Sequence, residues 1–192
     1  MKTAKMTAVS LLTAICLALP VAPSQAGDRI NLLEGDLAHF TKLGDANWSL
    51  KDGVLSASGG KGFLVTKEAF ANYELKLEFY PGTDTNSGVF MRCANPAKIN
   101  DKSCYEANIF DKRKDQSGRT GGIPNYAPPA VVIDSENQWN TYEITAKGSQ
   151  ITVKLNGKLT VDVKDETLAS GPIALQFRAG SIKFRNVQIR KL

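Results

Sequence analysis

The sequence predicts an all-β domain built as a sandwich of two antiparallel sheets. Apolar and polar residues alternate in short runs, the period of half-buried strands, and residues 73–79 give the clearest case. Compact turn signals separate the runs, among them Asn156-Gly157 between two alternating segments. Long helical patterns are missing between the runs, which is typical of a β-sandwich or jelly roll.

The other expected strands share this alternation and this short length. Further hairpin turns at residues 51–53 and 147–149 make neighbouring strands antiparallel for the most part. Only two segments, residues 32–39 and 67–71, could hold short helices, and we place them there. The remaining expected strands are residues 53–58, 88–93, 105–110, 141–146, 151–155, 159–163, 173–177 and 181–190.

The N-terminus has the order of a secretion signal over residues 1–26. Lys2 and Lys5 precede an apolar run at residues 8–19, and a small-residue stretch ends at Ala26. That run has 12 residues, whereas a helix needs about 20 to span a bilayer. We therefore expect cleavage after Ala26, an exported protein that is periplasmic or secreted, and no membrane attachment after cleavage.

The charge and length of the remaining chain narrow the function classes. Removing residues 1–26 takes away two lysines and no acidic residue, so the net charge of +5 falls to +3. A charge this small argues against nucleic acid as a partner. Residues 27–192 contain no internal repeat or linker and suit one domain.

Two cysteines remain after cleavage, Cys93 and Cys104. An exported protein matures in an oxidising compartment, where a nearby pair tends to close, so we predict a disulfide between them. The alternative is a pair of reduced thiols. The closed loop is short, and the loop model gives it a stabilisation of about 2–3 kcal/mol.

Three predicted strands place polar side chains on one face. If these strands are neighbours, they assemble amides, a carboxylate and guanidinium groups beside flat aromatic rings, which is the chemistry that binds sugars. The same alternation also fits the solvated face of an ordinary antiparallel sheet. The side chains that share this face are Phe90, Arg92, Glu106, Asn108, Phe110, Gln176 and Arg178.

A loop rich in Gly, Pro and charge at residues 111–130 interrupts the strand pattern. Loops of this length inside a compact domain are usually functional or disordered. Within it, Lys112-Arg113-Lys114 suits an anionic ligand, although a solvated charge run is the favoured interpretation. Asp111 is favoured as the residue that initiates the loop, and the alternative is a group that assists Glu106 or holds a cation beside it.

An ordered series of short motifs resembles the 3-keto-disaccharide hydrolase family. The resemblance runs from about Trp48 to the C-terminus, and it implies a concanavalin A-like jelly roll with a carbohydrate site on its concave face. The motifs are Gly62-Phe63-Leu64-Val65-Thr66, Phe70-Ala71-Asn72-Tyr73-Glu74-Leu75, Asn86-Ser87-Gly88-Val89-Phe90-Met91-Arg92, Tyr105-Glu106-Ala107-Asn108-Ile109, Trp139-Asn140-Thr141-Tyr142, Leu155-Asn156-Gly157 and Gly171-Pro172-Ile173-Ala174-Leu175-Gln176.

The resemblance implies cleavage of glycosides that are already oxidised at C3 of the sugar. A 3-keto group acidifies the C2 proton, so a base removes it and the C1 leaving group departs before water adds. Glu106 then has the acid/base role or contacts a cation, and Arg92 binds the enolate or a hydroxyl. Asn108 and Gln176 orient the substrate, and Tyr126 stands near a position where an aromatic residue is common.

One departure from the family bears on activity. Many members have a histidine two residues after this glutamine, whereas here the position is Arg178, and the only histidine of the chain is His39. Arginine does not act as a base near neutral pH. Either Glu106 transfers the proton, or the domain binds saccharides without cleaving them. A third possibility is a structural or partner-binding domain whose polar face is hydrated.

The sequence gives no sign of a cofactor. One histidine and two cysteines that we expect to be paired leave no metal-ligand spacing. Calcium stays open, because its oxygen ligands leave no spacing signal. Trp48 and Trp139 suit sugar stacking, but anchoring roles in the core or at its rim are favoured.

Overall fold

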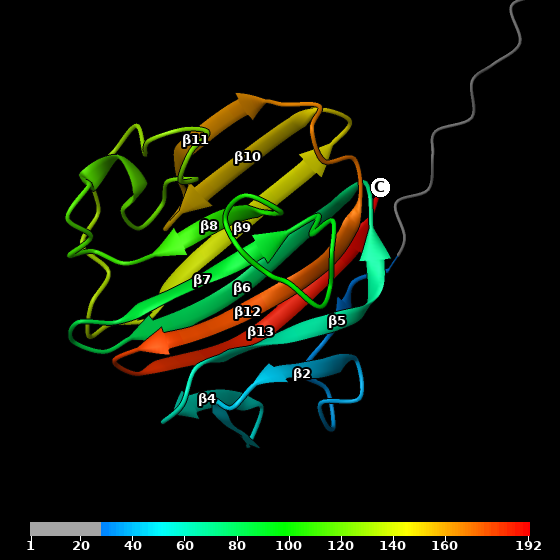
Figure 1. The fold of residues 1–192 in the computed structure, drawn as a ribbon, viewed down its shortest axis with the longest axis vertical. Helices are drawn as coiled ribbons and strands as arrows, with labels where there is room; N and C mark the ends of the chain where they lie inside the picture. The colour runs from blue at the N-terminus through cyan, green and yellow to red at the C-terminus, as the bar shows by residue number, and fades with distance from the viewer. Residues whose placement is uncertain (1–27) are drawn as a thin grey trace, which may run out of the picture.

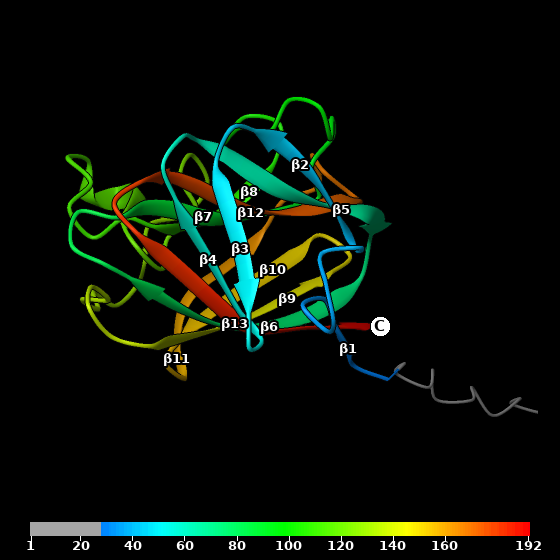
Figure 2. The ribbon, with the colours of Figure 1, turned by 90° about the horizontal axis from the view of Figure 1, so that it is seen from below.

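The computed structural model describes residues 28–192, and the predicted secretion signal lies outside the described residues. Two antiparallel sheets lie face to face, as Figures 1 and 2 show, so the predicted all-β sandwich is confirmed. The only helical element of the described residues is the short 3-10 helix η1, Gln116–Gly118. Across residues 28–192, no helix is long and apolar enough to cross a bilayer.

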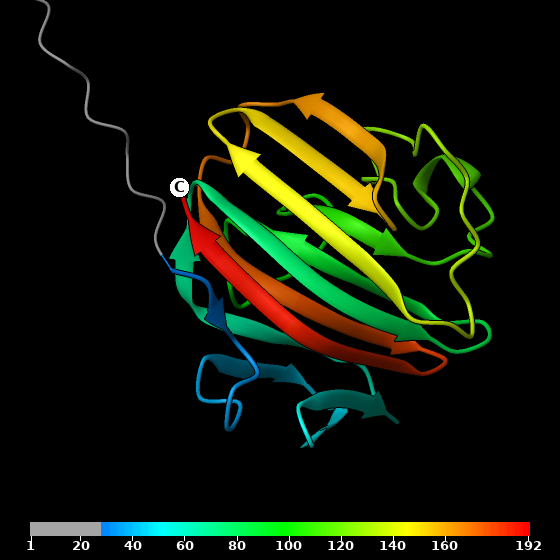
Figure 3. The ribbon, with the colours of Figure 1, turned by 180° about the vertical axis from the view of Figure 1, so that it is seen from behind.

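The larger sheet has eight strands and faces the viewer in Figure 3. Its order is β11-β10-β9-β6-β13-β4-β3, and β1 pairs with β13. The strands are β1 (Ile30–Asn31), β3 (Asn47–Lys51), β4 (Val54–Ser58), β6 (Tyr73–Pro81), β9 (Asn140–Lys147), β10 (Gln150–Leu155), β11 (Lys158–Lys164) and β13 (Ile182–Lys191).

The smaller sheet has five strands in the order β2-β5-β12-β7-β8. Its central strands β5, β12 and β7 come from three distant parts of the chain, so non-local pairing brings their side chains together. The strands are β2 (Phe40–Gly44), β5 (Gly62–Phe70), β7 (Asn86–Met91), β8 (Tyr105–Ile109) and β12 (Gly171–Ala179).

Alternation within each strand builds the core between the sheets. On β6, Leu75, Leu77 and Phe79 are buried in the main cluster, whereas Glu74 and Glu78 lie on the outer face. Sheet side chains point alternately to opposite faces, so each strand contributes every second residue to the core. The core thus follows the sequence pattern.

The five-stranded sheet is buried on both faces over part of its area. Val89 and Met91 of β7 pack into the main core, whereas Phe90 belongs to a second apolar cluster on the outer face. The segment between β7 and β8 crosses in front of this sheet (Figure 1) and covers that face. The second cluster consists of Val65, Phe90, Cys93, Ile99, Cys104 and Ala174.

The predicted disulfide between Cys93 and Cys104 is confirmed. It closes the crossing segment, residues 94–103, at the point where β7 ends and β8 begins. Ala94 also donates a backbone hydrogen bond to Ser103 at 2.8 Å. The disulfide therefore fixes both ends of the segment that covers the outer face.

The predicted hairpins form with the backbone conformation that their sequences favour. Asp52 and Gly53 have φ of 51° and 73° between β3 and β4, and Asn156 and Gly157 have φ of 51° and 77° between β10 and β11. Two-residue hairpins with both residues in the left-handed region match the twist of the strands, and Asn-Gly and Asp-Gly adopt them readily.

Both predicted short helices are wrong. Residues 32–39 form turns and bends, with Leu32 and Leu33 buried in the main core. Residues 67–70 continue β5, because Ala69 and Phe70 pair with the start of β12. A five-residue segment has little helical stability of its own, so strand pairing decides its conformation. Strands β1, β2, β3 and β5 were missing from the predicted set.

Candidate functional site

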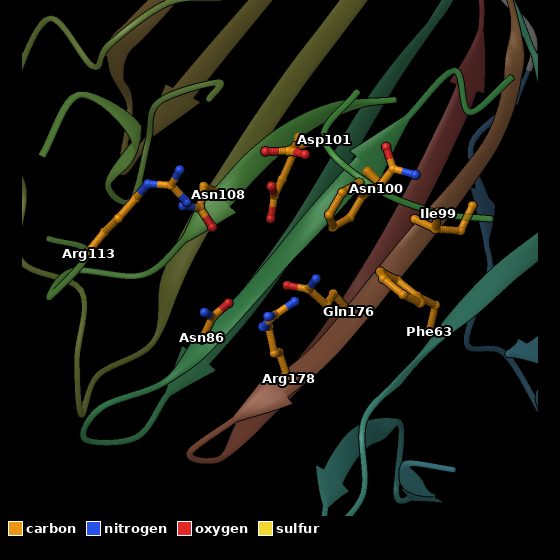
Figure 4. A pocket seen from close by; sticks show the side chains of 11 residues that line it. Phe63, Asn86, Ile99, Asn100, Asp101, Asn108, Arg113, Gln176 and Arg178 are labelled. Carbon is orange, nitrogen blue, oxygen red and sulfur yellow. The ribbon is translucent and has the colours of Figure 1, made fainter. Parts of the chain in front are cut away.

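A cavity of about 390 Å³ lies on the outer face of the five-stranded sheet. Strands β5, β7, β8 and β12 form its floor, the disulfide-closed segment forms one wall, and the loop after β8 contributes Arg113. Figure 4 shows Phe63 and Ile99 at one end and Arg113 with Asn108 at the other. The lining residues are Phe63, Asn86, Phe90, Ile99, Asn100, Asp101, Glu106, Asn108, Arg113, Gln176 and Arg178.

Strand register assembles most of the predicted polar face in this cavity. Gln176 is paired with Gly88 and Gly88 with Asn108, so these three positions form one row across β12, β7 and β8. The next row places Phe90 opposite Glu106. Five predicted residues therefore do line one surface, namely Phe90, Glu106, Asn108, Gln176 and Arg178.

Gly88 makes room for the carboxylate of Glu106. A Cβ atom at position 88 would lie 2.4 Å from Glu106 Oε1 and 3.2 Å from its Cδ. The Glu106 side chain therefore lies across the backbone of β7, in the space that any other residue at position 88 would fill. The glycine in the middle of a strand sets the direction of the carboxylate.

Glu106 has an unusual environment for a carboxyl group. The residue is 7% exposed, and its side chain makes no hydrogen bond or ion pair with any residue between 28 and 192. Burial, and secondarily the charge of Asp101, raises its pKa to about 8, against an opposing effect of Arg113 and Arg178. A carboxyl group with a pKa near neutral pH is suited to acid/base chemistry.

Gln176 presents an unsatisfied polar group to the same cavity. The residue is 7% exposed, and its buried Oε1 has no hydrogen-bond partner among the described residues. Buried polar atoms are almost always hydrogen-bonded in folded proteins, by protein groups, water or a ligand. Gln176 is thus a candidate ligand contact.

The side chain of Asn108 forms hydrogen bonds within the protein. Its Nδ2 donates to the backbone oxygen of Gly118, and its Oδ1 accepts from the Ile109 backbone amide at 2.9 Å. Its backbone also exchanges hydrogen bonds with Gly121 and Gly122. Asn108 therefore holds the loop after β8 against the cavity, a positioning role that differs from the predicted substrate contact.

Arg92 does not lie on the predicted polar face. Strand β7 ends at Met91, and Arg92 has a φ of 49°, so alternation no longer sets the direction of its side chain. The buried guanidinium donates to the backbone oxygens of Ala71, Gly148 and Leu168, at 3.0, 2.8 and 3.2 Å respectively. The predicted placement beside Glu106 is wrong, and Arg92 links three chain segments instead.

Other predicted aromatic contacts also lie elsewhere. Tyr126 packs against Tyr105, with ring centroids 4.8 Å apart, and is absent from the cavity lining. The ring of Trp139 lies 4.0 Å from the guanidinium carbon of Arg185, on β13 of the other sheet. Trp48 is buried in the core. The favoured anchoring roles of both tryptophans are consistent with these positions.

Asp111 initiates and anchors the long loop as its sequence position suggested. Its carboxylate accepts from the Ser135 hydroxyl at 2.8 Å and from the Glu136 backbone amide at 3.1 Å. The loop is thereby joined to the segment before β9. Asp111 is not among the cavity residues, and neither is His39.

Several cavity residues escaped the sequence analysis. Asp101 and Ile99 reach the cavity because the disulfide-closed segment folds back over the sheet, and Asn86 is the first residue of β7. Arg113 belongs to a charge run that was interpreted mainly as solvated surface. Local alternation carries no information on such loop placements, although the cysteine pair did indicate a short closed loop between β7 and β8.

Residues 28–192 contain no group of three or more His, Cys, Asp or Glu side chains placed to hold a metal ion.

The fold and the cavity together define a glycosidase-like or carbohydrate-binding jelly roll. Residues 28–190 match the model of the 3-keto-alpha-glucoside-1,2-lyase-like domain, and the chain belongs to this family.

Three solved structures with similar folds have names that refer to carbohydrate cleavage or carbohydrate binding. A "putative glycosyl hydrolase" from Parabacteroides distasonis ATCC 8503 is 26% identical, with a TM-score of 0.74 over 86% of this chain and 100% of that chain. The carbohydrate binding module CBM66 from Bacillus subtilis is 18% identical, with a TM-score of 0.62 over 78% and 93%. The Bacillus licheniformis beta-glucanase is 12% identical, with a TM-score of 0.60 over 88% and 99%.

The last two similarities concern the fold alone. No protein of curated function matches the sequence.

Proposed function

We propose that the domain cleaves glycosides of 3-keto sugars by elimination, with Glu106 as the group that moves the proton. The observation that carries this proposal is a buried, unpaired carboxyl group with a raised pKa, set in a cavity of small-ligand size. Membership of the 3-keto-alpha-glucoside-1,2-lyase-like family supports the same reaction class.

The chemistry needs one base of sufficient strength. Ionised Glu106 takes the proton from C2, which the neighbouring 3-keto group has acidified. The electrons of the C2–H bond form a C1=C2 double bond, and the C1–O bond to the leaving group breaks. The proton now on Glu106 passes to the departing oxygen, directly or through water, and water then adds across the double bond. A carboxylate whose pKa is about 8 is a stronger base than an ordinary one.

The neighbouring side chains supply the other requirements. Gln176 has amide groups free to hold a sugar hydroxyl or the enolate oxygen, and Arg178 adds a positive charge on the same strand. Phe63 offers an apolar surface for a sugar ring, and the buried Phe90 supports it edge to face, with ring centroids 5.4 Å apart.

We place this activity outside the cytoplasm. The order of charge, apolar run and small residues over residues 1–26 supports export, and the Cys93–Cys104 disulfide suits an oxidising compartment. Mass spectrometry of the N-terminus after expression in a secreting host tests cleavage after Ala26, and retention of Met1 contradicts it.

The direct test is turnover of 3-keto-trehalose or of an aryl 3-keto-glucoside. We expect product release by the wild-type protein, and incorporation of solvent deuterium at C2 because that proton is exchanged. Glu106→Gln removes the base and abolishes both. Glu143→Gln on β9 of the other sheet is the matched control and keeps wild-type turnover. Unchanged turnover in Glu106→Gln refutes the assignment.

Arg178 supports a second candidate, a non-catalytic carbohydrate-binding domain. It occupies a position where many family members have a histidine, so a base available to those members is missing here. Binding of the 3-keto sugar without product release and without deuterium incorporation establishes this second function.

A further inference from the structure

We propose that Arg113 and Arg178 together bind a singly charged anionic group on the saccharide, either a uronate carboxylate or a sulfate ester. This inference rests on the proposed function insofar as the ligand is a saccharide. It adds the substrate class, acidic sugars, and two residues that determine specificity.

The arginines of the chain differ in what their guanidinium groups contact. All seven lie within the described residues, and five of them use their guanidinium groups within the protein. Arg29 and Arg190 pair with Glu74, Arg185 pairs with Glu78, Arg119 pairs with Asp134, and Arg92 donates to three backbone oxygens.

Arg113 and Arg178 are the two exceptions. Within residues 28–192, neither guanidinium makes an ion pair or a hydrogen bond. Both line the same cavity, although they come from different elements, the loop after β8 and strand β12. A guanidinium offers five donors in a fixed planar arrangement that fits carboxylate and sulfate oxygens.

Two structural details show that the fold sets the position of the Arg113 side chain. A Cβ atom at Gly118 would lie 2.7 Å from Arg113 Nε, so the loop keeps a glycine where the Arg113 side chain passes. Asn108 donates to the backbone oxygen of the same glycine, which fixes this part of the loop to β8. The direction of Arg113 is therefore set by the loop and by the sheet beneath it.

A second polar group points to a ligand at the same place. Buried Gln176 lies two residues before Arg178 on β12, its Oε1 lacks a partner among the described residues, and Figure 4 shows the two side chains next to each other. Phe63 and Ile99 lie toward the other end of the cavity (Figure 4). A sugar ring against the apolar end thus directs an acidic substituent toward the arginines.

The charge balance favours one negative charge on the ligand. Arg113 and Arg178 contribute two positive charges, and Asp101 contributes one negative charge. Glu106 is largely protonated at neutral pH, because its pKa is raised to about 8. The residues that line the cavity therefore carry a surplus of one positive charge. A carboxylate or sulfate ester neutralises it, whereas a phosphate monoester with nearly two negative charges exceeds it.

Calorimetric binding of methyl glycosides to the full-length mature protein tests the inference independently of cleavage. The ligands are methyl glucoside, methyl glucuronide, and the 6-sulfate and 6-phosphate of methyl glucoside. We expect the uronide or the sulfate to bind at least about tenfold more tightly than the neutral glycoside, as hydrogen bonds to a charged group imply. Comparison of those two ligands identifies which anion is the natural one.

Variants assign the effect to the two arginines. Arg113→Gln and Arg178→Gln each lower the affinity for the preferred anion about tenfold, and each lowers the affinity for methyl glucoside by much less, so the preference for the anion is lost. Lys158→Gln, an exposed residue at the turn between β10 and β11, removes the same charge and keeps wild-type binding. Circular dichroism and the melting temperature confirm that each variant is folded.

Three results overturn the inference: equal binding of neutral and acidic glycosides, including no binding of either; tightest binding of the phosphate; or an anion preference that survives both arginine substitutions. These outcomes are separate from the failure of the proposed reaction. A preserved preference for acidic sugars without any cleavage refutes only the reaction, and cleavage of neutral 3-keto-glucosides without an anion preference refutes only this inference.

Discussion

The substitution Gly88→Ala tests how the fold sets the direction of the Glu106 carboxylate. An added Cβ would lie 2.4 Å from Glu106 Oε1, and ordinary contact begins at 3.4 Å, so the oxygen must move by about 1 Å. Gly88 lies in the interior of β7 and has no positive φ, so alanine is compatible with its backbone. The strain therefore falls on the end of a flexible side chain.

The expected result is a large loss of activity with a small loss of stability. Misplacing a reacting group by about 1 Å costs about a hundredfold in rate. The free energy of unfolding should fall by about 1 kcal/mol, at the low end of overpacking effects, because the Glu106 side chain is able to give way. Turnover of an aryl 3-keto-glucoside and urea denaturation measure the two quantities.

Gly82→Ala is the matched control. There an added Cβ would lie 2.2 Å from the Ser181 hydroxyl oxygen, a similar collision with a side-chain end in the turn between β6 and β7. It should keep full activity. In a double-mutant cycle, Gly88→Ala should cause no further loss in the Glu106→Gln background. Wild-type turnover in Gly88→Ala, or an equal loss in Gly82→Ala, refutes the reasoning.

Three further predictions concern stability. Replacing Cys93 and Cys104 with serine should lower the free energy of unfolding by about 3 kcal/mol according to the loop model, for a sequence separation of 11, and denaturation with and without reductant checks this. Arg92→Met should cost about 3 kcal/mol by leaving three backbone oxygens unpaired. The folded fraction should keep its turnover, and a selective loss of turnover restores Arg92 as a site residue. Between pH 4.5 and about 8 the folded state binds more protons than the unfolded state at Glu106, so stability should fall by a few kcal/mol as the pH rises through this range. This pH dependence should be absent from melting curves of Glu106→Gln.

The sequence correctly predicted which side chains share the polar face wherever the strands are regular. Alternation correctly placed Phe90, Glu106 and Gln176 together, because β7, β8 and β12 are neighbours that keep the period of two through these positions. The same rule failed at Arg92, one residue beyond the end of β7. A positive φ there reverses the relation between sequence position and side-chain direction.

The rest of the site depends on long-range contacts that local patterns do not encode. Asp101 reaches the cavity only because the segment closed by the disulfide folds over the sheet. Arg113 points inward because the loop after β8 is fixed by Asn108 and passes Gly118. Tyr126 instead packs against Tyr105, so a loop aromatic residue near the right motif lies partly buried against the core.

The most direct test of the account is the pH dependence of kcat/KM for an aryl 3-keto-glucoside, corrected for the uncatalysed elimination at each pH. If ionised Glu106 is the base, kcat/KM rises about tenfold per pH unit and levels off above about pH 8, where the carboxyl group is ionised. Glu106→Gln should show no activity above background at any pH. A plateau that begins near pH 4.5, or a Glu106→Gln profile that matches the wild type, contradicts the central claim.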